Sequence, residues 1–221
     1  MKRFAIAVLF TILFTTVNPA KAEGLSWTGF EVLLPVSAEI EVADQIGIRA
    51  QMINFFVPAR KVHLSFFYAG PTFTPVLIEH PDATGDPKTD PPPNFVLWVS
   101  PQFVGAANWY GTEDVPGDGI GPSVMLNMNA KGKFNVFLEI EAYFPVVADA
   151  GLTYYGFYSV DGAPKKWLNL GGQAEQVNDG IIFGPHVGMT KGPLHVEVQY
   201  YLGLQDVNRG HSIRLVTALG F

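Results

Sequence analysis

The chain has 221 residues, of which 48% are hydrophobic and 15% are charged, and it contains no cysteine. After residue 22 no apolar run approaches the roughly 20 residues that a transmembrane helix needs, so the composition excludes a helical membrane protein with several spans. The formal net charge of −6 also argues against a nucleic-acid partner, because phosphate binding requires a basic surface.

The first 22 residues have the pattern of a signal peptide. Lys2 and Arg3 give a basic start, residues 4–17 form an apolar stretch too short to span a membrane comfortably, and Ala20-Lys21-Ala22 places small residues at the cleavage positions. We expect cleavage after Ala22 and a single domain over residues 23–221, with a retained N-terminal anchor helix as the alternative. Cleavage removes three basic residues and no acidic one, which makes the mature chain more acidic.

From residue 30 onward, apolar and polar residues alternate with period two in one segment after another. Such alternation predicts strands with one apolar face. In chain order the predicted strands are Phe30–Val42, Ile46–Val57, Val62–Ala69, Ser123–Ala130, Phe134–Phe144, Ile182–Thr190, Leu194–Leu204 and Ser212–Phe221.

The region from Gly70 to Tyr110 is harder to interpret. We place two strands there, around Phe95–Val99 and Phe103–Tyr110, which gives about ten strands in all. A further hairpin at Leu152–Ser159 raises the number to twelve. If the region from Gly70 to Tyr110 stays outside the sheet, the number falls to eight.

The predicted connections are of two kinds. Three are short and basic: Pro58–Lys61, Lys131–Lys133 and Lys191–Gly192. Three are long and rich in Pro, Gly or acidic residues: Glu79–Asn94, Gly111–Gly121 and Pro145–Gly180. Membrane barrels place short turns in the periplasm and long loops outside, so we expect all three basic turns on the periplasmic side.

Three features favour a membrane barrel over a soluble sandwich. Several alternating runs reach 9 to 13 residues, close to the ~9–11 that a tilted membrane strand needs. Aromatic residues cluster near strand ends, as they do in an interfacial girdle. Finally, Ile213, Leu215 and Leu219 share one face with the terminal Phe221, with Thr217 as a weakly polar exception.

This C-terminal pattern resembles the assembly signal of bacterial outer-membrane β-barrels. The resemblance implies an antiparallel up-and-down transmembrane barrel in the outer membrane of a Gram-negative bacterium. It further implies contact with outer-membrane lipid and lipopolysaccharide. The barrel-assembly machinery is then expected to recognise the last strand through Phe221, Leu219, Leu215 and Ile213.

The predicted inward faces carry a set of polar residues that we interpret as a network: Arg49, His63, Glu139, Glu141, His186, His195, Glu197 and Arg214. Buried charges must pair, so we expect the three glutamates to meet the arginines and histidines in a filled interior. The alternative is a proton- or cation-binding site. A metal site would need His63, His186 and His195 to converge, and the sequence predicts neither a metal nor a cofactor.

The sequence favours a non-enzymatic barrel of structural or surface-interaction type, with a largely filled polar interior that leaves room at most for a narrow pore. The alternative is an outer-leaflet lipid-modifying enzyme, an acylhydrolase or acyltransferase, which needs a serine and a histidine near the outer rim. His211 and the adjacent Ser212 point to opposite faces of a strand. His63 and Ser65 share a face, which we expect to be inward and near the periplasmic end.

Overall fold

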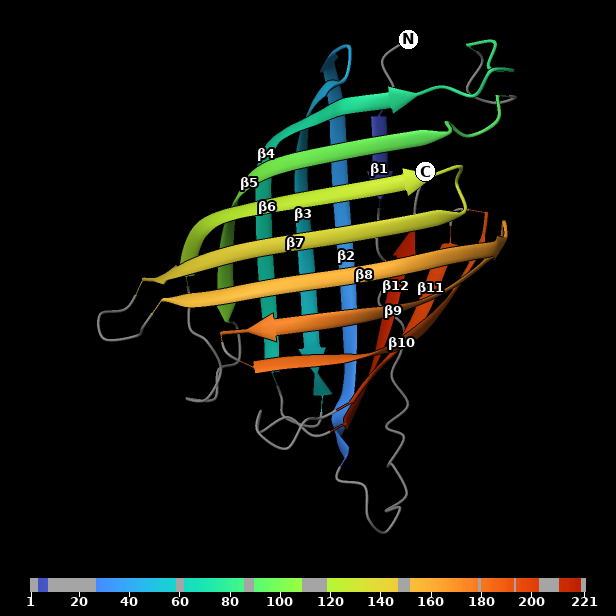
Figure 1. Ribbon diagram of the computed structural model, residues 1–221. Helices are drawn as coiled ribbons and strands as arrows, with labels where there is room; N and C mark the ends of the chain where they lie inside the picture. Colours follow the sequence, from blue (N-terminus) through green and yellow to red (C-terminus); the bar gives the residue numbers. More distant parts are fainter. Residues whose placement is uncertain are drawn as a thin grey trace.

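The computed structural model describes residues 4–7, 27–58, 62–85, 90–108, 119–146, 152–178, 180–192, 194–202 and 211–219. These residues form an all-β structure (Figure 1). The strands are β1 (Phe4–Ala7), β2 (Trp27–Ala43), β3 (Ile46–Val57), β4 (Val62–Ile78), β5 (Phe95–Asn108), β6 (Gly119–Ala130), β7 (Phe134–Pro145), β8 (Thr153–Lys165), β9 (Leu168–Val177), β10 (Gly180–Lys191), β11 (Leu194–Tyr201) and β12 (His211–Leu219). Within these ranges no helix is long and apolar enough to cross a membrane.

Strands β2 to β12 close into an eleven-stranded barrel. Each pairs antiparallel with the next along the chain, and the barrel closes where β12 pairs with β2. Because eleven is odd, this closing pair is parallel, joining His211–Val216 to Trp27–Leu33. β1 lies within the predicted signal peptide and pairs with residues 37–40 of β2. Cleavage after Ala22 stays a prediction.

The prediction of about ten strands is corrected to eleven by two differences. The region from Gly70 to Tyr110 contributes one strand of its own, β5, because β4 runs on to Ile78 and β5 is continuous from Phe95 to Asn108. The predicted long connection Pro145–Gly180 instead contains the complete hairpin of β8 and β9.

These differences change which turns share an end of the barrel. The connections at Asp44–Gln45, residues 131–133, Lys166–Trp167 and residues 192–193 lie at one end, which we call the short-turn end, although the long connection between β4 and β5 (residues 79–94) lies there as well. β3 ends and β4 begins at the opposite end, where β5, β7, β9 and β11 also end. We call this the long-loop end. The expectation that all three basic turns lie on one side is therefore wrong, and so is the expectation that Glu79–Asn94 lies on the side of the long connections.

The barrel needs glycine where neighbouring strands approach closely. In β6, a Cβ on Gly121 would overlap the carbonyl oxygen of Ala142 in β7. In β10, a Cβ on Gly184 would overlap the carbonyl oxygen of Tyr200 in β11. Figure 1 shows β4, β5 and β6 curving through a wide arc as the sheet turns back on itself. Glycine permits such bends because no side chain blocks the approach.

Large side chains fill part of the interior. A buried cluster joins Tyr68 of β4, Val104 of β5, Met125 of β6 and Tyr143 of β7. The Phe66 ring lies 6.2 Å from the Tyr143 ring, although two strands, β5 and β6, lie between β4 and β7 in the sheet. The inward residues therefore meet across the barrel. This is the arrangement that side chains adopt in barrels of about this size.

Candidate functional site

Seven of the eight residues predicted to form an interior network lie on the inward faces of their strands. They are Arg49 on β3, Glu139 and Glu141 on β7, His186 on β10, His195 and Glu197 on β11, and Arg214 on β12. The eighth, His63, lies on the outer face of β4. Its neighbours Phe66 and Tyr68 occupy the inward positions of that strand, so the aromatic face of β4 fills the barrel instead of facing outward.

Arg214 is the centre of the most connected cluster. Its Nε and Nη2 donate to Oε2 of Glu31 over 2.9 and 2.8 Å, and Nη2 also donates to Oε2 of Glu175 over 3.1 Å. Nη1 donates to the Tyr201 hydroxyl over 3.1 Å. The guanidinium lies over the rings of Tyr201 and Phe55, 4.8 and 5.1 Å from their centroids. Five strands thus meet at one buried cation near the long-loop end.

Of the predicted pairing of the three glutamates with arginines and histidines, the described residues contain one case, Glu197 Oε2 lying 3.6 Å from His195 Nε2, and neither arginine forms an ion pair with any of the three. Arg214 pairs with Glu31 and Glu175, neither of which the sequence interpretation named. Glu175 falls in the segment interpreted as a loop, although Asn169, Gln173 and Glu175 alternate with small or apolar residues there and could have indicated a strand.

Glu139 and Glu141 lie side by side on the inward face of β7. They are 5% and 1% exposed. The Tyr143 hydroxyl donates to Glu141 Oε2. Within the described part of the chain, Oε1 of each glutamate has no hydrogen-bond partner. Arg49 instead contacts Glu39, over 3.9 Å.

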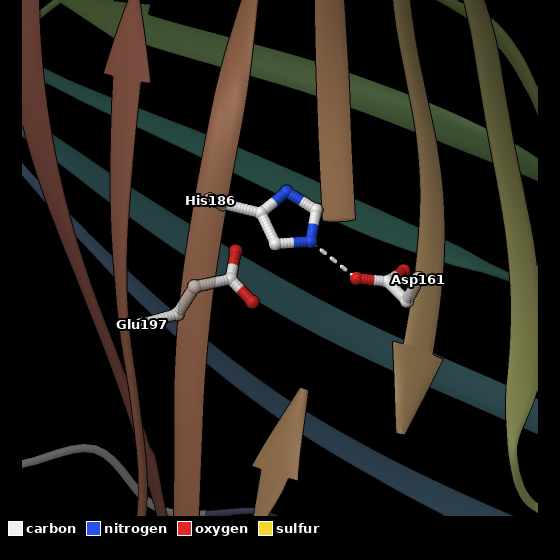
Figure 2. Close-up of side chains that lie close together, drawn as sticks. All are labelled: Asp161, His186 and Glu197. Carbon is white, nitrogen blue, oxygen red and sulfur yellow. Dashed lines mark hydrogen bonds and ion pairs between the residues drawn. The ribbon is translucent and has the colours of Figure 1, made fainter. Parts of the chain in front are cut away.

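A second interior cluster joins Asp161 of β8, His186 of β10 and Glu197 of β11 near the short-turn end (Figure 2). His186 contacts Asp161 through Nε2, and its Nδ1 lies 2.6 Å from Gln173 Oε1. A cavity of about 250 Å³ adjoins the cluster, and Asp161, Asn169 and Glu197 line it. The sequence predicted His186 and Glu197 as interior residues but missed Asp161, again because β8 was interpreted as loop.

The outer face carries a third polar cluster, formed by Asn54, His63 and Ser65. The Ser65 hydroxyl donates to Asn54 Oδ1 over 2.8 Å and lies 3.4 Å from His63 Nε2. His63 Nε2 lies 3.3 Å from the same amide oxygen, and the ring stacks on Phe56 with centroids 4.2 Å apart. Because β4 begins at Val62, this cluster lies towards the long-loop end, opposite to the end expected from the sequence.

The remaining predicted residues lie on β12. Ile213 and Leu215 share the outer face of this strand, paired with Tyr200 and Val198, and Leu219 is its last residue. Thr217 is 3% exposed. Phe221 lies outside the described residues. The Tyr200 hydroxyl lies 2.8 Å from His211 Nδ1. Ser212 is buried.

Comparisons with protein-family models, with curated proteins and with solved structures found no match to this chain. Its class is therefore defined by architecture alone. The protein is a closed eleven-stranded β-barrel with a charged, partly filled interior.

Proposed function

We propose that the mature chain is a transmembrane β-barrel of the bacterial outer membrane, with a structural or surface-interaction role and a lumen closed to ions. The observation that carries the proposal is the apolar outer face. Each strand from β2 to β11 exposes at least one large apolar side chain, such as Ile48 (56% exposed), Phe103 (72%) and Ile140 (56%). Soluble monomers rarely expose apolar surface this continuously, whereas lipid requires it.

The strand lengths agree with this proposal. β2 to β8 have 12 to 17 residues, more than the ~9–11 that a tilted strand needs to cross the hydrocarbon core. The connections agree with a membrane barrel only in part: the turns at Asp44–Gln45, residues 131–133 and Lys166–Trp167 share the end where β12 ends, but the long connection between β4 and β5 lies there too. The periplasm is then on the short-turn side, as an assembly signal at the C-terminus would require.

The odd number of strands is a departure from the proposed class. Bacterial single-chain barrels have even numbers of strands, and their first and last strands pair antiparallel. Here the closing pair is parallel, so β2 begins at the end where β12 also begins. The proposal therefore rests on the outer face and the strand lengths, not on topology.

The closed lumen follows from the side chains that occupy it. Arg214 and its partners link β12 to β2, β9 and β11, while the cluster around Tyr68 fills the space between β4 and β7. An ion crossing the barrel would have to break charge-assisted hydrogen bonds in a buried network, which is costly.

Cell fractionation tests the membrane assignment, and conductance measurements test the closed lumen. The mature protein should fractionate with outer membranes, resist carbonate extraction and change its mobility in detergent gels on boiling. In planar bilayers it should produce no stable single-channel current. A soluble periplasmic protein would refute the membrane assignment, and a steady conductance would refute the closed lumen.

The cluster of Asn54, His63 and Ser65 favours a second candidate, an outer-leaflet acylhydrolase. It brings a hydroxyl within 3.4 Å of an imidazole nitrogen, on the face and at the end where outer-leaflet lipid would lie, and the Ser65 hydroxyl would have to turn from Asn54 Oδ1 to an unprotonated His63 Nε2 before the reaction. Ser65 would attack the ester carbonyl while His63 takes the hydroxyl proton and passes it to the departing alcohol. Water would then release the acid.

This candidate stands second because Ser65 is only 2% exposed. Its test is release of fatty acid from phospholipid and from lipopolysaccharide by the purified barrel. Ser65→Ala should abolish release, whereas Ser212→Ala, which removes a hydroxyl from the interior, should leave it unchanged. Release that persists in Ser65→Ala, or no release at all, would eliminate this candidate without affecting the membrane assignment.

A further inference from the structure

Two carboxylates and one imidazole converge in the interior from three different strands. Figure 2 shows Asp161, His186 and Glu197 pointing toward one another. Each offers one ligand atom, and these atoms all lie within 4.8 Å of one another. In a tetrahedral Zn²⁺ site with bonds of 2.0–2.1 Å, ligand atoms lie roughly 3.4 Å apart, so small side-chain rotations would bring these three to that spacing.

The protonation pattern of His186 is fixed by its neighbour Gln173. The Gln173 amide nitrogen donates to the backbone carbonyls of Tyr200 and Pro185, over 3.2 and 3.5 Å. The amide oxygen must therefore point at His186 Nδ1, which lies 2.6 Å away and has to be the donor. Nε2, the nitrogen on the Asp161 side, is left to carry either a second proton or a metal ion.

A further hydrogen bond orients each of the three candidate ligands, at an atom that does not face the centre of the cluster. Gln173 holds the imidazole at Nδ1, Ser159 donates to Asp161 Oδ2 over 3.2 Å, and Gln199 donates to Glu197 Oε1 over 2.7 Å. His186 Nε2, Asp161 Oδ1 and Glu197 Oε2 face one another, and His195 Nε2 also lies 3.6 Å from Glu197 Oε2. Metal ligands are commonly oriented by such outer hydrogen bonds, which fix both the tautomer and the direction of each ligand.

The site also has room on its open side. A Cβ on Gly171 would lie 2.5 Å from His186 Nε2, so the glycine keeps the metal-facing nitrogen clear. Asp161 and Glu197 line the adjoining cavity of about 250 Å³, which can supply water as a further ligand. Asn169 lies beside the centre and donates to Glu197 Oε2 over 3.3 Å.

We propose that Asp161, His186 and Glu197 bind one divalent transition-metal ion, for which Zn²⁺ is the probe. One nitrogen and two carboxylate oxygens, with water completing the shell, form a donor set suited to Zn²⁺. The inference goes beyond the proposed function and does not depend on it, because the three residues belong to the interior of the barrel.

The experiment titrates Zn²⁺ into tag-free, chelator-treated full-length mature protein in detergent and follows the heat. We expect one ion per chain. His186→Gln, Asp161→Asn and Glu197→Gln should each weaken binding at least tenfold, and Gln173→Leu should weaken it by about 10- to 100-fold through loss of ligand orientation. The matched control is His80→Gln, which removes a partly exposed loop histidine 3.5 Å from Asp82 and should change nothing.

Absence of binding, or binding that survives all three ligand substitutions, would overturn the proposal, as would binding lost only in His80→Gln. Because a variant of a buried residue can fail to fold, X-ray absorption of the zinc-loaded wild-type protein gives an independent readout. It should show a shell of nitrogen and oxygen with a single imidazole. A shell without imidazole, or one with three or more, would place the ion elsewhere and refute this site, since among the described histidines only His195 lies close enough to add a second imidazole here.

Discussion

Replacing Arg214 with methionine tests whether the closed interior stabilises the barrel. Arg214 is 4% exposed and donates to Glu31, Glu175 and Tyr201. Methionine roughly keeps the length of the side chain but removes the charge, which leaves two carboxylates buried against each other without their cation. Removing one partner of a buried ion pair typically costs 3–5 kcal/mol, so we expect a loss of about 4 kcal/mol in the free energy of unfolding.

The measurement is reversible unfolding by urea in liposomes, followed by tryptophan fluorescence. The matched control is Arg49→Met, which removes the same group from a position 26% exposed, where Arg49 lies 3.9 Å from Glu39 and donates to Gln51 Oε1 over 3.2 and 2.7 Å. That change should cost about 1 kcal/mol or less. The triple variant Arg214→Met, Glu31→Gln, Glu175→Gln should recover much of the loss, because it leaves no charge uncompensated.

Equal losses in the two arginine variants would refute the reasoning, since they would mean that burial and hydrogen bonding do not distinguish Arg214. Failure of the triple variant to recover stability would also count against it. In that case the packing of Arg214 on Tyr201 and Phe55 would matter more than its charge.

Two further substitutions test the strand packing and the outer face. Gly121→Ala should destabilise the barrel by about 1–3 kcal/mol in the same urea assay, because the added Cβ overlaps a carbonyl of β7, whereas Gly105→Ala, with open space around it, should be neutral. Val198→Arg, at an exposed outer position in β11, should cost about 2–4 kcal/mol in liposomes if it lies near the bilayer midplane, whereas Val42→Arg beside the turn at Asp44 should be tolerated. Equal tolerance of both arginines would count against a lipid-facing outer surface.

Period-two alternation located most strands but could not say which face of a strand is inward. On β7 the assignment agrees with the structure, because Glu139 is buried and Ile140 is exposed. On β4 the predicted assignment is reversed, because Phe66 and Tyr68 pack in the interior cluster of the barrel. Both faces of β4 mix apolar and polar residues, so only contacts across the barrel decide which face of this strand is inward.

The candidate sites show a second limit of the sequence. Asp161 and Glu175 complete the two interior charged clusters, yet both lie in a stretch whose glycines and prolines suggested a loop. Gly171 and Gly172 are strand residues here, and Gly171 makes room for the ring of His186. Such glycines weaken the alternation signal at the positions where a side chain from a neighbouring strand needs space.

Strand order fixes which strand ends share an end of the barrel, and the orientation of that barrel in a membrane can be measured directly. β8 begins beside Leu152 at the long-loop end and ends beside Lys166 at the short-turn end, and both residues are exposed. The chain has no cysteine, so Leu152→Cys and Lys166→Cys each introduce one thiol. If the short turns face the periplasm, an impermeant maleimide should label Leu152→Cys in intact cells and Lys166→Cys only after the outer membrane is permeabilised. The reverse pattern would invert the barrel. It would move the cluster of Asn54, His63 and Ser65 to the inner leaflet, and with that change the outer-leaflet acylhydrolase would lose its substrate.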